Sequence, residues 1–509
     1  MSIYAAIDIG SNSVRLAVAD IALRRSYRLV AADRVVTRIG ESVFSSGRVS
    51  AKTIDNTCEV LERFAREYRE WQPAAVRAVA TSALRDARNQ QEFLTRAAEA
   101  IGTPVEIISG TEEARLIHLG VTTRWPRREP NLLLLDIGGG SAEVIWSQDG
   151  AIRYATSMPL GAVRLTGSFL HHDPPEPEEV AALEEYIEQQ FAASLHRLGP
   201  RRPARAIGTS ATAAAVVCAV NRIKSADREE ADGRRARLAE VRRLYRNLIA
   251  LDVDGRRRVP GIGPRRAEII LAGTAVLRYF VEHFTTGSLY YSTAGLRDGI
   301  IADLAARGVT HQDVALDPQQ RQVVSQMAHR YGVSLPHARQ VATLGRALFV
   351  GLASLHRLPL EFGRWLEAAA YLHDIGHFVS STRHHRHSYY LVSNSDLPGF
   401  TDHERLLVAN LCRYHRKNLP DPDHDNYRQL EPADRQAVRR LIPLLRIADG
   451  LDRGHRQLVT SVDCQVSDGE TRVRVDGKPG LELDLWAARQ SAPAFQEVYQ
   501  SRLLVSPGR

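Results

Sequence analysis

One sequence pattern occurs twice in this chain and constrains its fold more than any other feature. Residues 132–146 have the sequence LLLLDIGGGSAEVIW, and residues 5–18 have the sequence AAIDIGSNSVRLAV. Both pass from an apolar run through Asp-Ile-Gly and small or polar residues to Ser and a second apolar run, which predicts a buried strand, a tight turn and a returning strand. Two such units in one register predict two related lobes that present their loops to a shared cleft.

The two loops are candidate phosphate sites. Glycines lack a Cβ and can reach positive φ, so their backbone N–H groups can approach an oxyanion closely. In the shared register Asp8 corresponds to Asp136, and Arg15 stands where the second loop has Glu143. The first loop is therefore expected to attract phosphate, and the second to hold metal and water against it; the alternative is a pair of ordinary hairpin turns. The candidate phosphate-binding residues are Asp8, Gly10, Ser11, Asn12, Ser13, Arg15, Gly138, Gly139, Gly140 and Ser141.

Two further segments place polar residues after short strands. The strand predicted over residues 75–80 is followed by TSALRDA, whose Arg85 at a helix start suits an anion, although simple helix capping by Ser82 explains the hydroxyls equally. The strand predicted over residues 105–108 leads into SGTEEARL, where we expect Thr111 to cap a helix. A carboxylate near a phosphate loop can orient and deprotonate water, and spacing alone does not choose between Glu112 and Glu113.

The remainder of the first 305 residues completes the second lobe. ARAIGTSATAAAVV predicts a strand, a turn of Gly208, Thr209 and Ser210, and a packed helix; contact of this turn with a ligand and a purely structural turn are both open. Helices are predicted over residues 49–71 and 178–197. The charged residues 222–258 predict a solvated helical excursion, and a last strand at 288–292 precedes a closing helix.

Composition narrows the partners. The chain has 509 residues and a net charge of +8, and only four of its 67 basic residues are lysine. Arginine binds phosphate bidentately, so this surface permits phosphate or nucleic-acid ligands but predicts no specific nucleic acid. The four cysteines are far apart and form no zinc or disulfide pattern. No apolar run is long enough for a membrane span and no signal peptide is evident, which predicts a cytoplasmic protein without a membrane partner.

The two loops, together with TSALRDA, SGTEEARL, IGTSATAAAV and STAGLRDGI, resemble the exopolyphosphatase and guanosine pentaphosphate phosphohydrolase family of the actin and sugar-kinase superfamily. The resemblance runs from about residue 3 to residue 305. It implies an α/β fold of two actin-like (ribonuclease H-like) lobes, residues 1–122 and 123–305, with the last helix packing back on the first lobe. It also implies a homodimer, Glu113 as the catalytic base and Arg85 as a phosphate ligand.

The second half has a different character. From about residue 315 the pattern is helical, and the order of His337, His373, Asp374 and Asp449 resembles the HD phosphohydrolase superfamily. These four are candidate ligands of a second divalent metal. His377 follows His373 by one helical turn, and four additional histidines would extend the site to two metals. In relatives with degraded ligands this domain is a structural wall and dimer contact, and the basic residues at 383–387 and 413–417 would alternatively form a groove for a polyanion. The additional histidines are His384, His385, His387 and His415.

We therefore expect an all-α HD-type domain over residues 315–457, followed by a small α+β domain over residues 458–509. In the latter, VTSVDCQV, TRVRVD and LELDLW alternate as strands do, and one helix and the strand SRLLVS follow.

The predicted function is removal of terminal phosphate from inorganic polyphosphate, with Mg²⁺ held by Asp136 and Glu143 in the cleft. Three alternatives stay open. In the first, the substrate is guanosine pentaphosphate, which is converted to guanosine tetraphosphate. In the second, the protein is a nucleotide or alarmone sensor without turnover. In the third, the HD-type domain is a metal phosphohydrolase that acts on a nucleotide or phosphate ester.

Overall fold

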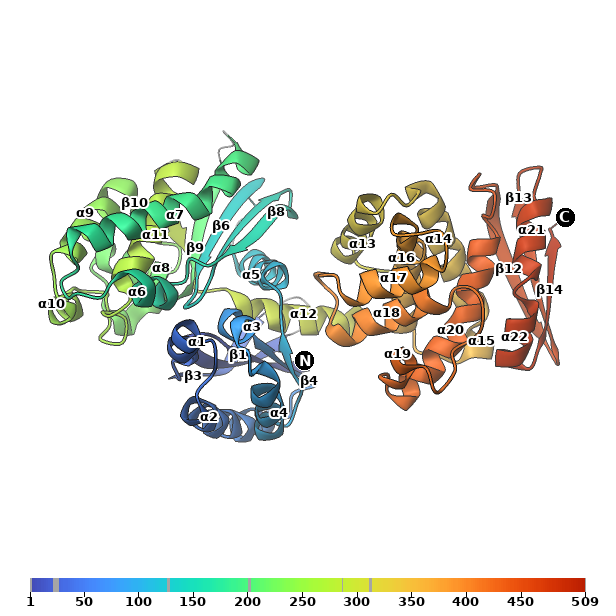
Figure 1. The fold of residues 1–509 in the computed structure, drawn as a ribbon, viewed down its shortest axis with the longest axis horizontal. Coiled ribbons are helices and arrows are strands. Elements are labelled where there is room, and N and C mark those ends of the chain that lie inside the picture. The colour runs from blue at the N-terminus through green and yellow to red at the C-terminus, as the bar shows by residue number, and fades with distance from the viewer. Residues whose placement is uncertain are drawn as a thin grey trace. The chain divides into compact units, whose positions relative to one another are not determined.

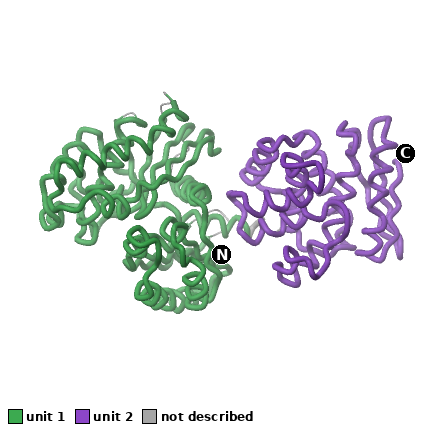
Figure 2. Tube along the Cα trace, viewed as in Figure 1, with its two compact units in different colours: residues 1–307 green, residues 308–509 purple. Residues whose placement is uncertain are grey.

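The computed structural model describes residues 2–21, 27–125, 129–199, 203–285, 287–310 and 314–508. The chain forms two compact units, residues 1–307 and 308–509 (Figure 2). Each unit is described here by itself. Within the described ranges, no helix combines the length and the apolar character that a membrane crossing requires.

The first unit begins with a five-stranded sheet in the order β3-β2-β1-β4-β5. Strands β1 to β3 form an antiparallel meander, and β4 and β5 add in parallel to β1. Both faces of β1 are buried: Ala5, Ile7 and Ile9 point into one core cluster, and Tyr4 and Ala6 into another. The bounds are β1 (Ser2–Ile9), β2 (Ser13–Ile21), β3 (Tyr27–Val36), β4 (Ala75–Ala80) and β5 (Val105–Ile107).

A second sheet repeats this topology (Figure 1). Its order is β10-β11-β9-β6-β7-β8, in which β6 to β8 form the meander and β9 and β11 add in parallel. Asp8 pairs with Arg15 in the first sheet, and Asp136 pairs with Glu143 at the same place in the second. The bounds are β6 (Asn131–Ile137), β7 (Ala142–Gln148), β8 (Ala151–Met158), β9 (Arg205–Thr209), β10 (Arg235–Arg237) and β11 (Ser288–Tyr291).

Helices cover both sheets. In the first lobe α2 and α4 pack on one face, and α12 packs on the other through Ile300, Ile301 and Ala305. Helix α5 contributes Leu116 to the core of the first sheet and Ala114, Ile117 and Val121 to that of the second, so it lies between the lobes. The bounds here are α1 (Ile39–Ser46), α2 (Ala51–Glu70), α3 (Ser82–Asp86), α4 (Gln90–Ile101), α5 (Gly110–Arg124) and α12 (Leu296–Thr310).

The second lobe holds the remaining helices of this unit. Its main core gathers apolar side chains of α7, α8, α9 and α11 against the second sheet. The bounds are α6 (Ala162–Phe169), α7 (Pro177–Leu198), α8 (Ser210–Asn221), η1 (Ser225–Ala231), α9 (Leu238–Ile249), α10 (Val253–Arg258) and α11 (Ile270–Phe284).

Two local expectations in this unit are wrong. Ser109, and not Thr111, is the N-cap of α5, because the Ser109 side chain accepts the hydrogen bond from the backbone N–H of Glu112. Residues 222–258, which we expected to be a solvated helical segment, also contain a strand and a buried residue. Strand β10 pairs with β11 inside them, and Ala236 is fully buried, because alternate residues of this short charged strand face the core.

The second unit is a helical domain followed by a small sheet. Its helices share one continuous core. Between residues 314 and 458, all described, the chain forms helices and no strand. The bounds are α13 (Pro318–Arg330), α14 (Leu335–Gly351), α15 (Ala353–His356), α16 (Glu361–Leu372), η2 (Ile375–Phe378), α17 (His384–Ser393), α18 (Asp402–Tyr414), α19 (Asp425–Arg428) and α20 (Pro432–Gly450).

The C-terminal part contains β12 (Val459–Ser467), β13 (Glu470–Gly477) and β14 (Arg502–Pro507) in that order in one sheet, with α21 (Glu482–Arg489) and α22 (Ala492–Tyr499) between β13 and β14. We expected the segment LELDLW to be a strand, and this prediction is wrong because the segment lies mostly in α21. Leu485 and Ala488 are buried and Trp486 is 57% exposed, so burial here follows helical spacing and not alternation.

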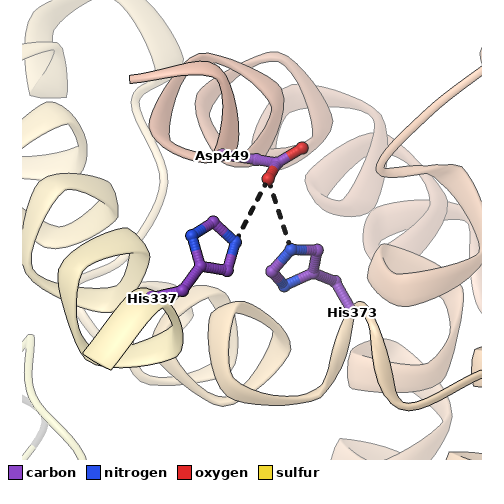
Figure 3. Close-up of side chains that lie close together, drawn as sticks. All are labelled: His337, His373 and Asp449. Carbon is purple, nitrogen blue, oxygen red and sulfur yellow. Dashed lines mark ion pairs between the residues drawn. The ribbon is translucent and has the colours of Figure 1, made fainter. Parts of the chain in front are cut away.

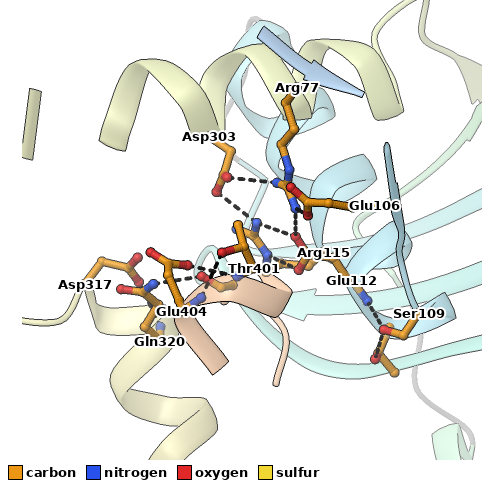
Figure 4. A network of polar contacts seen from close by, with 12 residues as sticks. Arg77, Glu106, Ser109, Glu112, Arg115, Asp303, Asp317, Gln320, Thr401 and Glu404 are labelled. Carbon is orange, nitrogen blue, oxygen red and sulfur yellow. Dashed lines mark hydrogen bonds and ion pairs between the residues drawn. The ribbon is translucent and has the colours of Figure 1, made fainter. Parts of the chain in front are cut away.

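A buried ion-pair network joins α5, α12 and β4 (Figure 4). Arg115 makes a bidentate contact with Glu112, at 2.7 and 2.9 Å, and donates to Asp303 at 2.8 Å. Arg77 contacts Asp303 at 3.1 Å and Glu106 at 3.0 Å. Although burial opposes ionisation, the surrounding guanidinium groups hold the pKa of Asp303 well below its usual range. The network fixes the helix that carries Glu113.

Substitution Asp303→Ala is expected to destabilise the first unit by about 3–5 kcal/mol, because it removes the carboxylate that Arg77 and Arg115 share and leaves the buried network with an excess of positive charge. Hydrogen exchange of peptides from β4 and α5 measures the unfolding free energy of this unit separately. The control is Asp254→Ala, which removes the exposed pair with Arg257 and should cost about 1 kcal/mol or less. Equal losses in the two variants would contradict a stabilising network.

Candidate active site

The two glycine loops have the same internal hydrogen bond. In the first, the backbone N–H of Gly10 donates to the carbonyl of Ser13 at 3.1 Å; in the second, that of Gly138 donates to the carbonyl of Ser141 at 2.9 Å. The loops also lie against each other, since a Cβ on Gly139 would be 3.1 Å from the backbone nitrogen of Asn12. The repeat therefore places the two loops together at the junction of the lobes.

Close approach, and not backbone conformation, explains the glycines. Gly138, Gly139 and Gly140 do not have positive φ, contrary to our expectation. A Cβ on Gly140 would lie 2.6 Å from Ser82 Oγ and 2.7 Å from Ser11 Oγ, well inside contact distance. A larger residue at this position would thus separate the loops.

A cavity of about 760 Å³ opens at these loops. Its wall contains most of the predicted phosphate-binding residues, together with Glu113, Asp136 and several arginines. The predicted residues in the wall are Asp8, Gly10, Ser11, Asn12, Ser13, Arg15, Gly138, Gly139, Gly140, Ser141 and Ser210.

Buried carboxylates gather at one part of this cavity. Asp8, Glu113 and Asp136 line the wall, and the Asp136 carboxylate accepts a hydrogen bond from Thr209 Oγ1. Burial raises the pKa of Asp8 and Asp136. Burial and the charges of these two aspartates raise the pKa of Glu113 to about 7, against the opposing effect of Arg85. A carboxylate with such a pKa can accept a proton at neutral pH.

Glu143 is the fourth carboxylate of the group. It is 1% exposed, its Oε1 accepts a hydrogen bond from Ser157 at 2.7 Å, and its Oε2 has no hydrogen-bond partner in the described part of the chain. Burial, with the nearby charges of Glu113 and Asp136, raises the pKa of Glu143 well above its usual value. A buried carboxylate oxygen without a partner beside other carboxylates fits a divalent cation, as expected for Asp136 and Glu143.

The structure distinguishes the two adjacent glutamates of α5. Glu112 is held by Arg115 and Arg77 in the buried network, whereas Glu113 lines the cavity. Helix α5 is positioned by its close crossing with α12, where a Cβ on Gly299 would lie 1.8 Å from the Leu116 carbonyl oxygen. The orientation of α5 between the sheets therefore presents Glu113 to the cavity.

Arginines also line the wall, beside further carboxylates at Asp33, Glu229, Asp232 and Asp298. Arg34 donates to Ser13 Oγ at 3.3 Å, and Arg297 donates to the Leu16 carbonyl at 2.8 Å. Burial and the charges of neighbouring arginines lower the pKa of Arg34 and Arg266, yet a guanidinium stays protonated at neutral pH. Arg124 pairs with Asp298 at 2.8 Å, whereas the other five wall arginines form no ion pair with a carboxylate within the described ranges. These five are Arg15, Arg34, Arg228, Arg266 and Arg297.

Four predicted site residues of the first unit lie outside the cavity wall: Glu143, Arg85, Gly208 and Thr209. The Arg85 guanidinium donates to Glu113 at 2.9 Å and to the carbonyl of Ile108 at 2.8 Å. Gly208 packs beneath the Leu289 side chain, and Thr209 holds Asp136. In this structure Arg85, Gly208 and Thr209 position the wall residues, and contact of Arg85 with substrate phosphate stays a prediction.

Sequence reasoning missed five of the six wall arginines as site residues. Arg34 lies on β3, Arg124 in α5, Arg228 in η1, Arg266 just before α11, and Arg297 in α12. No local motif unites them, because they come from segments far apart in the sequence. Arg297 lies in the segment STAGLRDGI, to which no site role was given; for the other four the available signal was the preference for arginine over lysine in the whole chain.

The second unit brings together the four predicted metal-ligand residues. Figure 3 shows His337 from α14, His373 at the end of α16 and Asp449 from α20 pointing toward one another. We expected His373 and His377 to lie one turn apart on one helix, and this is wrong. Helix α16 ends at Leu372, and His377 lies in η2. His377 nevertheless lies near Asp374, with Nε2 3.7 Å from Oδ1.

Two family models match this chain. The Ppx/GppA phosphatase family model matches residues 18–307, and the model for domain III of Ppx/GppA phosphatase matches residues 320–483. The Aquifex aeolicus PPX-GPPA enzyme is 29% identical, with a TM-score of 0.53, and the match covers 59% of this chain and 99% of that one.

Two other solved structures are similar over the same extent. An exopolyphosphatase-like protein is 26% identical, with a TM-score of 0.56, and the match covers 60% of this chain and 99% of that one. An exopolyphosphatase from Cytophaga hutchinsonii is similar in fold. It is 24% identical, with a TM-score of 0.55, and the match covers 60% of this chain and 98% of that one. The expected pair of actin-like α/β lobes is confirmed. The family model covers more than half of this chain, which also has the duplicated loops and the carboxylate-lined cleft described above. This chain therefore belongs to the Ppx/GppA phosphatase family.

Proposed function

We propose that this protein is an exopolyphosphatase, which hydrolyses the terminal phosphoanhydride bond of inorganic polyphosphate in the cavity of the first unit. The observation that carries the proposal is a wall in which buried carboxylates lie at the two loops and five arginines form no ion pair with a carboxylate in the described part of the chain. Guanidinium groups without such partners favour an anion with several charges, and a phosphate chain supplies one at each residue.

Each residue has a role that follows from its position. The backbone N–H groups of the two loops, with Ser13 and Ser141, hold the terminal phosphoryl group. The arginines of the wall bind the phosphates behind it. Glu113 orients the attacking water and accepts its proton at carboxylate oxygen Oε1 or Oε2, while Arg85 fixes the orientation of that carboxylate.

A divalent cation, which we take to be Mg²⁺, would be held by Asp136 and Glu143. When bound, it supplies charge neutralisation for the phosphoryl oxygens. The partnerless Oε2 of Glu143 and the raised pKa of both carboxylates support this assignment. Thr209 and Ser157 hold the two ligands in place through their hydroxyl groups.

The proposal is tested by incubating the purified full-length protein and Mg²⁺ with long-chain polyphosphate and, separately, with guanosine pentaphosphate at matched concentration. Release of phosphate from polyphosphate with the larger kcat/KM supports the proposal. Turnover of guanosine pentaphosphate alone would move the assignment to the second candidate. Two aromatic residues, Tyr27 and Tyr291, line the cavity wall, and their presence is the observation that keeps this candidate. Tight guanosine tetraphosphate binding with no turnover of either substrate would indicate a sensor.

The pH dependence follows from Glu113. Its carboxylate must be ionised to accept a proton, so kcat/KM should rise as pH increases through about 7 and then level off. The measurement is the initial rate of phosphate release at low substrate concentration across this range. In Glu113→Asp the pH midpoint of this rise in kcat/KM should shift. A profile identical to that of the unsubstituted protein would mean that the ionisation of another group causes the rise.

A further inference from the structure

The second glycine loop is attached to the start of helix α6 through its carbonyl groups. The Gly138 carbonyl accepts a hydrogen bond from the backbone N–H of Ala162 at 3.0 Å. The Gly139 carbonyl accepts from the backbone N–H groups of Val163 at 2.9 Å and Arg164 at 3.1 Å. The first turn of α6 therefore fixes one side of the loop.

This attachment decides the direction of the loop's N–H groups. Across a trans peptide bond, the carbonyl of one residue and the N–H of the next point in opposite directions. Because the carbonyls of Gly138 and Gly139 face α6, the N–H groups of Gly139 and Gly140 point away from it, and neither donates to a backbone carbonyl of the described residues. The loop lines the cavity and residues 161–164 do not, so these N–H groups are on the substrate side.

The third carbonyl of the loop is held by a side chain that also reaches the first lobe. Arg164 Nε donates to the Gly140 carbonyl at 2.8 Å. The Nη2 atom of the same guanidinium forms an ion pair with Asp86 and lies 3.4 Å from Ser82 Oγ, and both of these partners are in α3. One planar group thus joins the second loop to the first lobe.

An aromatic ring of the first lobe packs on this guanidinium. Arg164 Cζ lies 4.0 Å from the centre of the Phe44 ring, which is within the range of a cation–π interaction. The Arg164 side chain is only 22% exposed, so water competes little for its hydrogen bonds. A lysine could not make the same set of contacts, because its charge and its donors are on a single nitrogen.

We propose that Arg164 is a positioning residue for phosphoryl transfer, through which contact with the first lobe sets the orientation of the second glycine loop. The inference rests on the proposed function, because it takes the N–H groups of Gly139 and Gly140 as donors to the terminal phosphoryl group. Arg164 does not line the cavity and acts through the loop. Donors that are already oriented stabilise the charge of the transition state best, so loss of Arg164 should lower kcat more than it raises KM.

Kinetics of Arg164→Met with long-chain polyphosphate test this role. The variant keeps an unbranched side chain and loses the guanidinium. We expect kcat to fall roughly 10–100-fold, because the loop donors are displaced. We expect KM to change less than about threefold, because the wall arginines remain. An unchanged kcat in Arg164→Met would overturn the proposal.

Arg38→Met is the matched control. Arg38, in the first lobe, pairs with Glu268 of the second lobe at 3.3 Å, and both side chains are half-exposed. The variant therefore removes an arginine contact between the lobes that does not involve the loop, and its kcat should stay within about twofold of the unsubstituted protein. Equal losses of kcat in the two variants would mean that any contact between the lobes has this effect, which contradicts the role of Arg164.

A double-mutant cycle tests the link to the first lobe. Asp86 lies outside the cavity wall, so Asp86→Asn should affect the loop only through Arg164. Its kcat should fall roughly threefold to tenfold, and kcat of Arg164→Met/Asp86→Asn should be no lower than that of Arg164→Met alone. An unchanged kcat in Asp86→Asn, or losses that multiply in the double variant, would overturn the link.

Hydrogen exchange of the full-length protein gives a readout that does not depend on turnover. The N–H groups of Ala162 and Val163 are bonded to the loop, so their peptide should exchange roughly tenfold faster in Arg164→Met and at an unchanged rate in Arg38→Met. Peptides of β6 should exchange equally in all variants, and faster exchange there would show general destabilisation and contradict the assigned role. If the unsubstituted protein released no phosphate from polyphosphate, the proposed function would fail, whereas equal exchange of the α6 peptide in Arg164→Met would overturn the positioning role itself.

Discussion

Glu113→Gln should lower kcat for polyphosphate hydrolysis about 10²–10⁴-fold, because the amide cannot accept a proton from the attacking water. The residue is the only one of the two adjacent glutamates that lines the cavity, and its pKa of about 7 suits a base at neutral pH. The loops and arginines remain, so KM should change much less than kcat. The rates are compared at a pH above 7, where the carboxylate is ionised.

Glu112→Gln is the matched control for this variant. It is next to Glu113 in the first turn of α5, but its carboxylate contacts Arg115 and Arg77 in the buried network. Its loss should weaken the stability of the first unit and leave kcat of the folded protein nearly unchanged. If Glu112→Gln and Glu113→Gln reduced kcat equally, the loss would come from a displaced helix and not from a missing base.

Arg34→Gln/Arg228→Gln should raise KM for long-chain polyphosphate strongly. A hydrogen bond to a charged group contributes about 1.5–3 kcal/mol, so each lost arginine–phosphate contact should raise KM roughly tenfold to a hundredfold. The effect on kcat should be smaller, since the loops and Glu113 serve the terminal phosphoryl group. The effect on tripolyphosphate should also be smaller, because that substrate has few phosphates behind the terminal one.

The control for this pair is Arg242→Gln. Arg242 is half-exposed and pairs with Glu282 outside the cavity wall, so the variant removes a positive charge without removing a wall arginine. Kinetics on polyphosphates of several lengths compare the variants. An equal rise in KM for Arg242→Gln would mean that net charge, and not the wall, attracts the substrate.

Much of the fold was predictable because its signals are local. The expected helix over residues 178–197 is α7 (Pro177–Leu198), and the strand expected over residues 75–80 is β4. The wrong predictions concern segments whose charged residues or alternating pattern suggested another structure. Strand β10 was hidden by its arginines, and LELDLW alternates in sequence although its burial follows a helix. Burial against neighbouring elements decides such short segments, and their own sequence does not.

The sequence by itself determined the duplicated strand, loop and strand, because apolar runs and a loop of Asp, Gly and Ser are specified by neighbouring residues. It also determined that Asp8 corresponds to Asp136 and Arg15 to Glu143 in the repeat, and the structure pairs these residues across the strands, Asp8 with Arg15 and Asp136 with Glu143. Only the tertiary structure decided between Glu112 and Glu113. Both lie in the same helical turn, and the one that meets the cavity depends on how α5 is rotated between two sheets. The convergence of Arg34, Arg228, Arg266 and Arg297 on one cavity was likewise decided only by the packing of segments far apart in the chain.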